Sequence, residues 1–260
     1  MTGFFSAEAN LSDHAHAGQF ESNFPMKFVI GLVAGASALC LASSAFAAPP
    51  APIPPGDGSF GGLFLKSDHR AVAVAAITAF TKSTPPSKAL GAGICVDRTN
   101  ATDFSVFGAY ASFEDNYTSG RSVPSAEVLA LWKMRYRANF KPLIPFAIVE
   151  GKTVEHFFRF SVPTNNTDAF VQAASKLSAQ LATDNKGASL MVAAPVGGGE
   201  DESNVVHVRM IYPDNKSAGM ALDNFFKGGK AGAAFKEMRA LSTGMIGNIE
   251  DCEKFSYAKK

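Results

Sequence analysis

Ionisable side chains interrupt two segments that are otherwise apolar and rich in β-forming residues, VEHFFRFSV and VVHVRMIY. Successive side chains of a strand point to opposite faces of a sheet, so the alternation in each segment separates an apolar face from a more polar one. The apolar faces are expected to pack on helices. The opposite faces carry Glu155, Arg159, His207 and Arg209.

In a cavity, these four side chains would form a cationic group with one carboxylate and one imidazole. Such a group can hold an anionic or enolate-like ligand, with His207 as acid, base or metal ligand. Two alternatives stay open. A sheet face exposed to water carries the same alternation, and Glu155 can simply pair with Arg159 or Arg209.

A metal centre is not expected. His156 belongs to the apolar face of its segment and is interpreted as a core histidine, whereas His207 belongs to the opposite face. Metal sites need three or four converging ligands, and no third ligand is spaced to join the two histidines. The residues predict no cofactor.

The second half of the chain, residues 152–257, would position these side chains. Its periodicity predicts the βαββαβ order of a ferredoxin-like unit. Three glycines at 197–199, followed by acidic residues, are interpreted as a hairpin loop, and those at 228–229 as a break in the last helix. Strands are expected at 154–162, 188–196, 204–212 and 245–257, and helices at 166–184 and 217–242.

The first half, residues 59–150, has the same predicted order. One ferredoxin-like unit covers a single sheet face with helices, and two in tandem can join their open faces. We therefore expect an α+β fold with two tandem ferredoxin-like βαββαβ units, at 58–151 and 152–260, forming a pseudo-dimeric α/β barrel. In the first half, strands are expected at 59–66, 89–96, 103–113 and 145–150, helices at 68–84 and 125–140, and a polar loop at 114–123.

The strands VEHFFRFSV and NVVHVRMIYPD, and the helical segment that leads into MIGNIEDCEKF, resemble the dimeric α/β-barrel superfamily. That superfamily includes antibiotic-biosynthesis-type monooxygenases, stress-responsive barrel proteins and, in tandem form, chlorite dismutase-like haem proteins. The resemblance covers residues 152–257 better than 59–150. It implies the barrel fold, and it makes haem an alternative cofactor, although no haem-ligand motif matches position by position.

The expected sheet order gives the two cysteines of the folded region a common location. In the order 4-1-3-2, strands 2 and 4 are the edges of each unit. Cys95 lies on strand 2 of the first unit and Cys252 on strand 4 of the second, and these edges meet when a barrel closes. A disulfide between Cys95 and Cys252 is predicted, and two unrelated buried thiols are the alternative.

The N-terminal region resembles a targeting segment. A lysine, an apolar run and an Ala-Phe-Ala cleavage site predict a signal peptide at 26–47. Residues 1–25 are interpreted as an upstream extension, and the Pro/Ala-rich stretch 48–57 as a tether. The apolar run is too short to span a bilayer, so a periplasmic or secreted protein without a membrane span is expected.

The charge balance excludes some partners. The chain has 24 basic and 23 acidic residues, a formal net charge of +1, and no long basic run. Nucleic acid and anionic membrane surfaces are therefore not expected as main partners.

The function that these features predict is binding of a small organic ligand, in or beside the barrel, by an exported protein. Arg159, His207 and Arg209 would contact the ligand. One alternative is an oxidoreductase, either cofactor-independent and monooxygenase-like or haem-dependent. The other is a non-catalytic structural or protein-interaction role.

Overall fold

The computed structural model describes residues 57–120 and 123–257. The predicted extension at 1–25, the predicted signal peptide at 26–47 and the predicted tether up to residue 56 lie outside the described residues. Among the residues that are described, no helix is long and apolar enough to cross a membrane.

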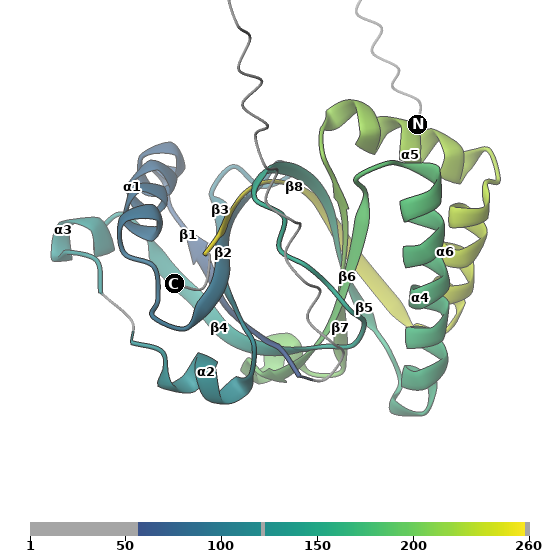
Figure 1. Cartoon of the computed structure of the whole chain (residues 1–260), viewed down its shortest axis with the longest axis horizontal. Helices are drawn as coiled ribbons and strands as arrows, with labels where there is room; N and C mark the ends of the chain where they lie inside the picture. Colours follow the sequence, from purple (N-terminus) through teal and green to yellow (C-terminus); the bar gives the residue numbers. More distant parts are fainter. Residues whose placement is uncertain (1–56, 121–122, 258–260) are drawn as a thin grey trace, which may run out of the picture. The chain divides into compact units, whose positions relative to one another are not determined.

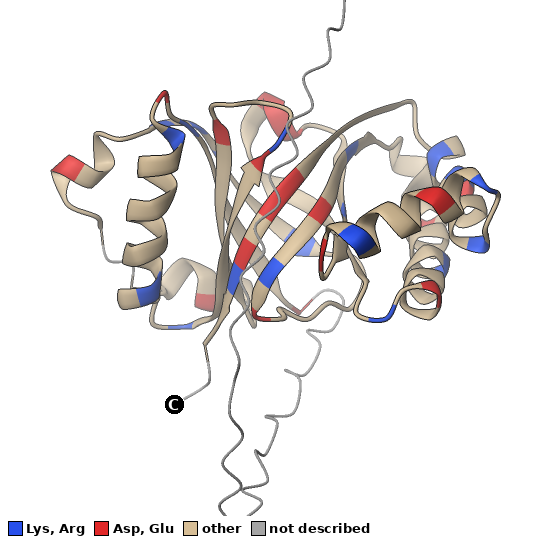
Figure 2. Cartoon of the chain, turned by 90° about the horizontal axis from the view of Figure 1, so that it is seen from above, with Lys and Arg blue, Asp and Glu red and all other residues tan. Residues whose placement is uncertain are grey.

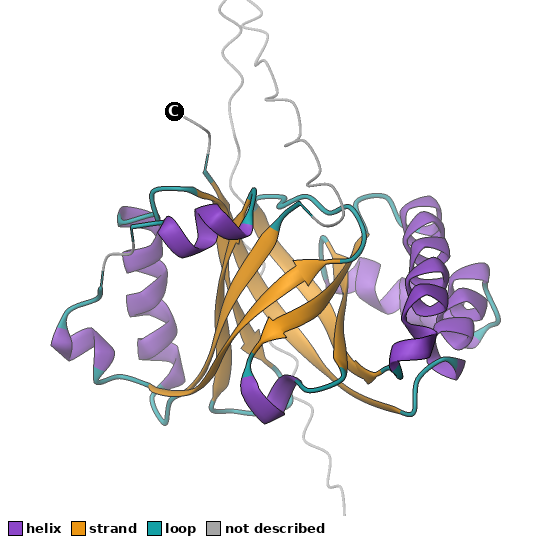
Figure 3. Ribbon diagram, turned by 90° about the horizontal axis from the view of Figure 1, so that it is seen from below, coloured by secondary structure: helices purple, strands orange, loops and turns teal. Residues whose placement is uncertain are grey.

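Eight antiparallel strands in the described part of the chain close into one barrel (Figures 1 and 3), in the order β1-β3-β2-β8-β5-β7-β6-β4. Every strand has two hydrogen-bonded neighbours, so the sheet has no free edge. The strands are β1 (Ser59–Lys66), β2 (Ala89–Asp97), β3 (Asp103–Tyr110), β4 (Lys133–Pro142), β5 (Gly151–Ser161), β6 (Ser189–Gly197), β7 (Val205–Tyr212) and β8 (Gly244–Ser256).

Helices lie on two opposite sides of this barrel (Figure 3). The first half of the barrel, β1 to β4, carries α1, α2 and α3, and the second half, β5 to β8, carries α4, α5 and α6 (Figure 1). The helices are α1 (Arg70–Ser83), α2 (Phe113–Thr118), α3 (Ala126–Leu129), α4 (Thr167–Asp184), α5 (Asn215–Phe226) and α6 (Lys230–Ala240), with 3-10 turns η1 (Thr164–Asn166) and η2 (Gly199–Glu202).

An apolar stripe fixes α4 against the sheet. Phe170, Ala173, Ala174, Leu177 and Leu181 recur every three or four residues and are fully buried. Such a stripe needs an apolar partner surface, which the outer faces of β5, β6 and β7 provide. Together with α5 and α6 they form a continuous core between helices and sheet.

A second apolar cluster lies inside the barrel. Phe60 on β1 and Phe140 on β4 pack with Phe146 and Ile148 from the segment 143–150. The ring centroids of Phe60 and Phe146 are 4.2 Å apart. This segment runs across one end of the barrel (Figure 1) and covers it with apolar side chains.

The predicted elements of the second half are confirmed to within three residues at each end. The predicted break in the last helix is also confirmed, because α5 ends at Phe226 and α6 begins at Lys230. Gly228, between them, has a positive φ of 83°. Glycine adopts this conformation without the steric cost that a side chain would bring.

The helix predicted at 125–140 is wrong beyond its first turn. Only α3 is helical there, and β4 follows from Lys133. Tyr136, Ala138 and Phe140 alternate with polar residues and belong to the cluster inside the barrel. Pairing of β4 with both β1 and β6 closes the sheet, and this tertiary pairing outweighs the helical pattern.

Two smaller predictions for the first half are also wrong. The loop predicted at 114–123 contains α2, which begins because the Ser112 hydroxyl accepts a hydrogen bond of 3.0 Å from the Asp115 amide. The strand predicted at 145–150 is irregular, with a β-bridge at Phe146 alone. Phe146 and Ile148 turn into the barrel, which is incompatible with a regular ladder there.

The predicted disulfide is confirmed. On the seam between the two halves, β2 pairs with β8, and Cys95 lies directly opposite Cys252 and is bonded to it. Both residues are buried. The bond joins positions 157 residues apart, and the chain-entropy relation assigns a stabilisation of about 5 kcal/mol to a loop of that length.

Replacing Cys95 and Cys252 together by alanine should lower the free energy of unfolding by about 3–5 kcal/mol, because the unfolded chain gains the entropy of an open loop. Urea unfolding of the variant and the oxidised wild type measures the difference. Wild-type protein refolded with a reductant should behave like the variant. Equal unfolding midpoints for the variant and the oxidised protein would contradict this expectation.

Candidate functional site

All four predicted site residues lie on the barrel-facing sides of β5 and β7. Arg159 pairs with His207 across the two strands, and Arg209 lies two residues further along β7. Glu155, His207 and Arg209 are buried, and the side chain of Arg159 is 26% exposed. The structure therefore differs from the alternative of an open, water-facing sheet. Figure 2 shows acidic and basic positions together on the barrel strands.

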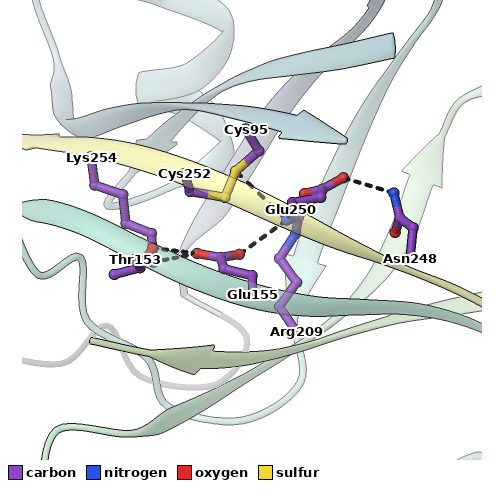
Figure 4. Close-up of a disulfide and its surroundings, with 8 residues drawn as sticks. All are labelled: Cys95, Thr153, Glu155, Arg209, Asn248, Glu250, Cys252 and Lys254. Carbon is purple, nitrogen blue, oxygen red and sulfur yellow. Dashed lines mark hydrogen bonds and ion pairs between the residues drawn. A yellow bond between two sulfur atoms is a disulfide. The ribbon is translucent and has the colours of Figure 1, made fainter. Parts of the chain in front are cut away.

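The four side chains do not form one group. Glu155 and Arg209 belong to a buried ion network with Glu250 and Lys254 from β8 (Figure 4). Arg209 Nη1 donates to Glu155 Oε2 at 3.0 Å and also to Glu250. Lys254 Nζ lies 2.6 Å from the other Glu155 oxygen. Two carboxylates and two cations thus balance each other.

The Arg209 side chain of this network has two further close neighbours. The guanidinium carbon of Arg209 lies 4.1 Å from the centroid of the Phe157 ring, and Arg209 Nη1 is 3.7 Å from the sulfur of Cys95. Burial by itself would raise the pKa of Glu155, but Lys254 and Arg209 outweigh it and hold this pKa below its usual value. Burial raises the pKa of Glu250, and Arg209 offsets this only in part. Arg209 is therefore committed to its carboxylates.

A second group, the barrel-end cluster, contains Arg159 and His207 together with Tyr136 and Glu202. His207 Nε2 and Glu202 Oε2 are 2.6 Å apart, and Arg159 Nη2 lies 3.8 Å from Glu202 Oε1. Burial raises the pKa of Tyr136, and the nearby Glu202 carboxylate adds to this effect.

Aromatic rings surround His207. Their centroids lie 4.5 Å away for Phe140, 5.0 Å for Phe157 and 6.3 Å for Phe64. Burial lowers the pKa of His207 below its usual value, although the hydrogen bond to Glu202 works in the opposite direction. The imidazole is therefore neutral near pH 7, with Glu202 holding the ring in place.

Glu202 was not anticipated from the sequence. The glycines at 197–199 and the acids after them were predicted to form a simple hairpin loop, but the turn η2 folds Glu202 inward, where it is 3% exposed. Gly198 makes room for it, because a Cβ at Gly198 would lie only 2.5 Å from Glu202 Cγ. No periodicity marks Glu202, so a run of three acidic residues was the only available signal.

Cavities flank these two groups. At the end of the barrel opposite the segment 143–150, a cavity of about 430 Å³ is lined by Arg159, Tyr136 and Ser105, among others. A space of about 50 Å³ lies inside the barrel, and one of about 180 Å³ lies beside the segment 143–150 and α4; Arg209 lines both. We call the first of these three the barrel-end cavity.

A further pocket lies outside the barrel, between α1 and the outer face of β1, β3 and β4. This α1 pocket has a volume of about 460 Å³. Most of its lining is apolar and aromatic, and Trp132, the one tryptophan of the chain, is part of it. In the second half, the corresponding space is filled by the core under α4, α5 and α6. Other lining residues are Leu63, Ile77, Phe80, Tyr110, Leu129 and Arg137.

One group of possible metal ligands within residues 57–120 and 123–257 is occupied by protein contacts, and the α1 pocket lacks a usual haem ligand. The sulfurs of Cys95 and Cys252 and one carboxylate oxygen each of Glu155 and Glu250 lie within 4.8 Å of one another, but the sulfurs are joined in a disulfide and Arg209 donates into the group. Haem iron usually takes a histidine or cysteine ligand. The lining of the α1 pocket contains neither residue type.

Comparisons with known proteins agree on the fold. No protein-family model matches the sequence, and no curated protein matches it. A solved structure of a candidate monooxygenase from Fusobacterium nucleatum subsp. nucleatum is similar with a TM-score of 0.58 and 12% identity, covering 79% of this chain and 99% of that one. The chain has the dimeric α/β-barrel fold.

Two other solved structures with the dimeric α/β-barrel fold are similar to the same extent. An anthrone oxidase-like protein matches with a TM-score of 0.57 and 14% identity, over 78% of this chain and 95% of its own. A candidate monooxygenase from Lactobacillus acidophilus NCFM matches with a TM-score of 0.55 and 14% identity, over 76% and 94%. At these identities the likeness concerns the fold.

Replacing Arg209 by methionine should lower the free energy of unfolding by about 3–5 kcal/mol, because Glu155 and Glu250 would stay buried without their shared cation. Arg98→Met is the matched control. It removes the ion pair of Arg98 with Asp251, whose side chains are 35% and 56% exposed, and should cost less than about 1 kcal/mol. Equal losses in urea unfolding would show that the buried ion network is not stabilised by Arg209.

Acid should destabilise the protein below about pH 6.5, the usual histidine pKa. Because the pKa of His207 is lowered in the folded protein, this histidine binds a proton more readily in the unfolded chain. The free energy of unfolding therefore falls as the pH decreases. In His207→Gln, the fall in unfolding free energy between pH 7 and pH 5 should be smaller. His69→Gln, at an exposed position, should follow the wild type. Parallel curves for wild type and His207→Gln would contradict this.

Proposed function

We propose that the protein binds a small, largely apolar organic molecule in the α1 pocket, beside the barrel. The observation that supports this most strongly is the difference between the two halves. In the second half a continuous apolar core lies between the sheet and the helices, whereas the first half keeps a cavity of about 460 Å³ there. A pocket of this size with apolar walls and a few polar groups is typical of small-molecule sites.

The lining indicates the type of ligand. Trp132, Phe80 and Tyr110 provide aromatic surface. Aromatic walls favour a planar apolar ligand. The predicted ligand contacts of Arg159, His207 and Arg209 are not required for binding in the α1 pocket.

We infer that the two halves are tandem ferredoxin-like units. The first half has the strand order β4-β1-β3-β2 and the second half β8-β5-β7-β6, and both correspond to the order 4-1-3-2 within their half. We also propose that the protein is exported. The Cys95–Cys252 disulfide supports this, because disulfides persist mainly in oxidising compartments.

Trp132 makes the binding proposal directly measurable. Titration with 8-anilinonaphthalene-1-sulfonate, an aromatic probe with one anionic group, should quench Trp132 fluorescence with saturation at one site. Leu63→Phe places a larger, rigid ring in the α1 pocket and should weaken binding about tenfold or more, a change that corresponds to about 1.4 kcal/mol.

Val72→Phe is the matched control. It makes a comparable enlargement on α1, but Val72 is 58% exposed and is absent from the lining of the pocket. Its affinity for the probe should equal that of the wild type. Binding that is insensitive to Leu63→Phe, or equally reduced by Val72→Phe, would refute the proposed site.

A further inference from the structure

The α1 pocket contains two buried side chains whose hydroxyl groups have no partner. Tyr110 on β3 is 3% exposed and Thr81 on α1 is 7% exposed, and both line the pocket. Within residues 57–120 and 123–257, neither hydroxyl group makes a hydrogen bond, because Thr81 accepts its one bond from another side chain at the main-chain oxygen.

Both hydroxyl oxygens are open to the pocket. In the described ranges, the polar side-chain atoms that are both enclosed and unpartnered belong to Ser105, Arg159 and Glu202. Tyr110 Oη and Thr81 Oγ1 are not among them, so each keeps surface that a small molecule can reach. Since both residues line the α1 pocket, a molecule in this pocket can complete their hydrogen bonds, as buried polar groups require.

The position of the Tyr110 hydroxyl follows from the small residues beside it. A Cβ at Gly108 would lie 3.0 Å from Tyr110 Oη, so the phenol leans back along β3 and its oxygen lies over Gly108. Gly108 pairs with Gly61 on β1 and with Ala92 on β2, and all three residues line the pocket. Tyr110 Oη therefore lies on a floor of small residues, where a ligand can approach it.

A third residue, Tyr257, shows that Thr81 lies at the same end of the pocket as Tyr110. The Tyr257 hydroxyl donates to the main-chain oxygen of Thr81 at 3.1 Å. Burial raises the pKa of Tyr257 to about 12, and the nearby Tyr110 phenol adds to this effect. Tyr110 and Thr81 are thus both neighbours of Tyr257, and their two unpartnered O–H groups form one polar end of the pocket.

The other end of the pocket is apolar. Leu65, four residues after Gly61 on β1, packs in one apolar cluster with Trp132, and both line the pocket. At a rise of about 3.3 Å per residue, this end lies about 13 Å from the polar end. A ligand that fits both ends therefore carries an oxygen at one end and an apolar body behind it.

We propose that Tyr110 and Thr81 orient the ligand of the α1 pocket by donating hydrogen bonds to a carbonyl oxygen at one end of an otherwise apolar molecule. A carbonyl oxygen has two lone pairs and can accept from both hydroxyl groups. A hydrocarbon of the same shape leaves both groups unpaired, which is how polar sites discriminate between similar molecules. This proposal rests on the proposed function of the α1 pocket and adds the chemical group that the ligand carries.

The probes are 1-indanone and indane, two flat bicyclic molecules that differ only in one carbonyl oxygen. Calorimetric titration measures the affinity of the full chain for each. Tyr110→Phe removes the phenol oxygen alone and should weaken binding of 1-indanone about tenfold, because one hydrogen bond to the ligand is lost. Its affinity for indane should stay the same. Thr81→Val replaces a hydroxyl by a methyl group of similar size and should act in the same direction.

Tyr257→Phe is the matched control. It also removes a phenol hydroxyl from this region, but that hydroxyl is bonded to the main chain and Tyr257 is not among the residues that line the pocket. The ratio of its affinities for the two probes should equal the wild-type ratio. Without ligand, Tyr110→Phe should melt at the wild-type temperature or above it, because the lost hydroxyl has no protein partner, whereas Tyr257→Phe should melt lower.

The outcomes separate this proposal from the proposed function. If Tyr110→Phe changes the affinities for 1-indanone and indane by the same factor, the orienting role is wrong, while binding of both probes still supports the α1 pocket as a site. A Tyr110→Phe variant that melts clearly below the wild type would also overturn the role, since its hydroxyl would then serve the fold. If neither probe binds, or if Leu63→Phe weakens neither, both proposals fail together.

Discussion

The closed barrel depends on the position of Arg209 between Glu155 and Glu250. Burying a carboxylate without a counter-charge is very costly. Lys254 supplies the second cation, so the charges of β5, β7 and β8 cancel within a few ångströms. The barrel interior thus has a polar side on β5, β7 and β8, where the charges are balanced. Its other side, on β1 and β4, is apolar and contains Phe60 and Phe140.

The two halves have the same strand order but differ in how their helices pack on the sheet. The second half packs α4, α5 and α6 on its outer face in one continuous apolar core. The first half has one long helix, α1, and two short ones, and it cannot fill the corresponding volume. One half of the barrel thus has the larger core between helices and sheet, and the other half has the α1 pocket.

Side-chain alternation predicted much of this arrangement. It assigned the four site residues to the inner face correctly, because β5 and β7 are long and regular. The same reasoning could have found Glu250 and Lys254, which are two residues on either side of Cys252. It could not find Glu202, which reaches the interior from a turn, or recognise β4 inside a helix-like pattern. Both depend on closure of the barrel, which local sequence does not encode.

The two seams of the barrel are unequal in strength. Strands β2 and β8 pair without a shift over residues 91–97 and are joined covalently by Cys95 and Cys252. Strands β4 and β6 pair over residues 139–142 only, with a shift in register. The β2–β8 seam is therefore covalently fixed, and the β4–β6 seam is held by only a few hydrogen-bonded residue pairs. Thermal opening of the barrel would begin between β4 and β6. Small molecules could exchange with the barrel interior there while the rest of the fold is retained.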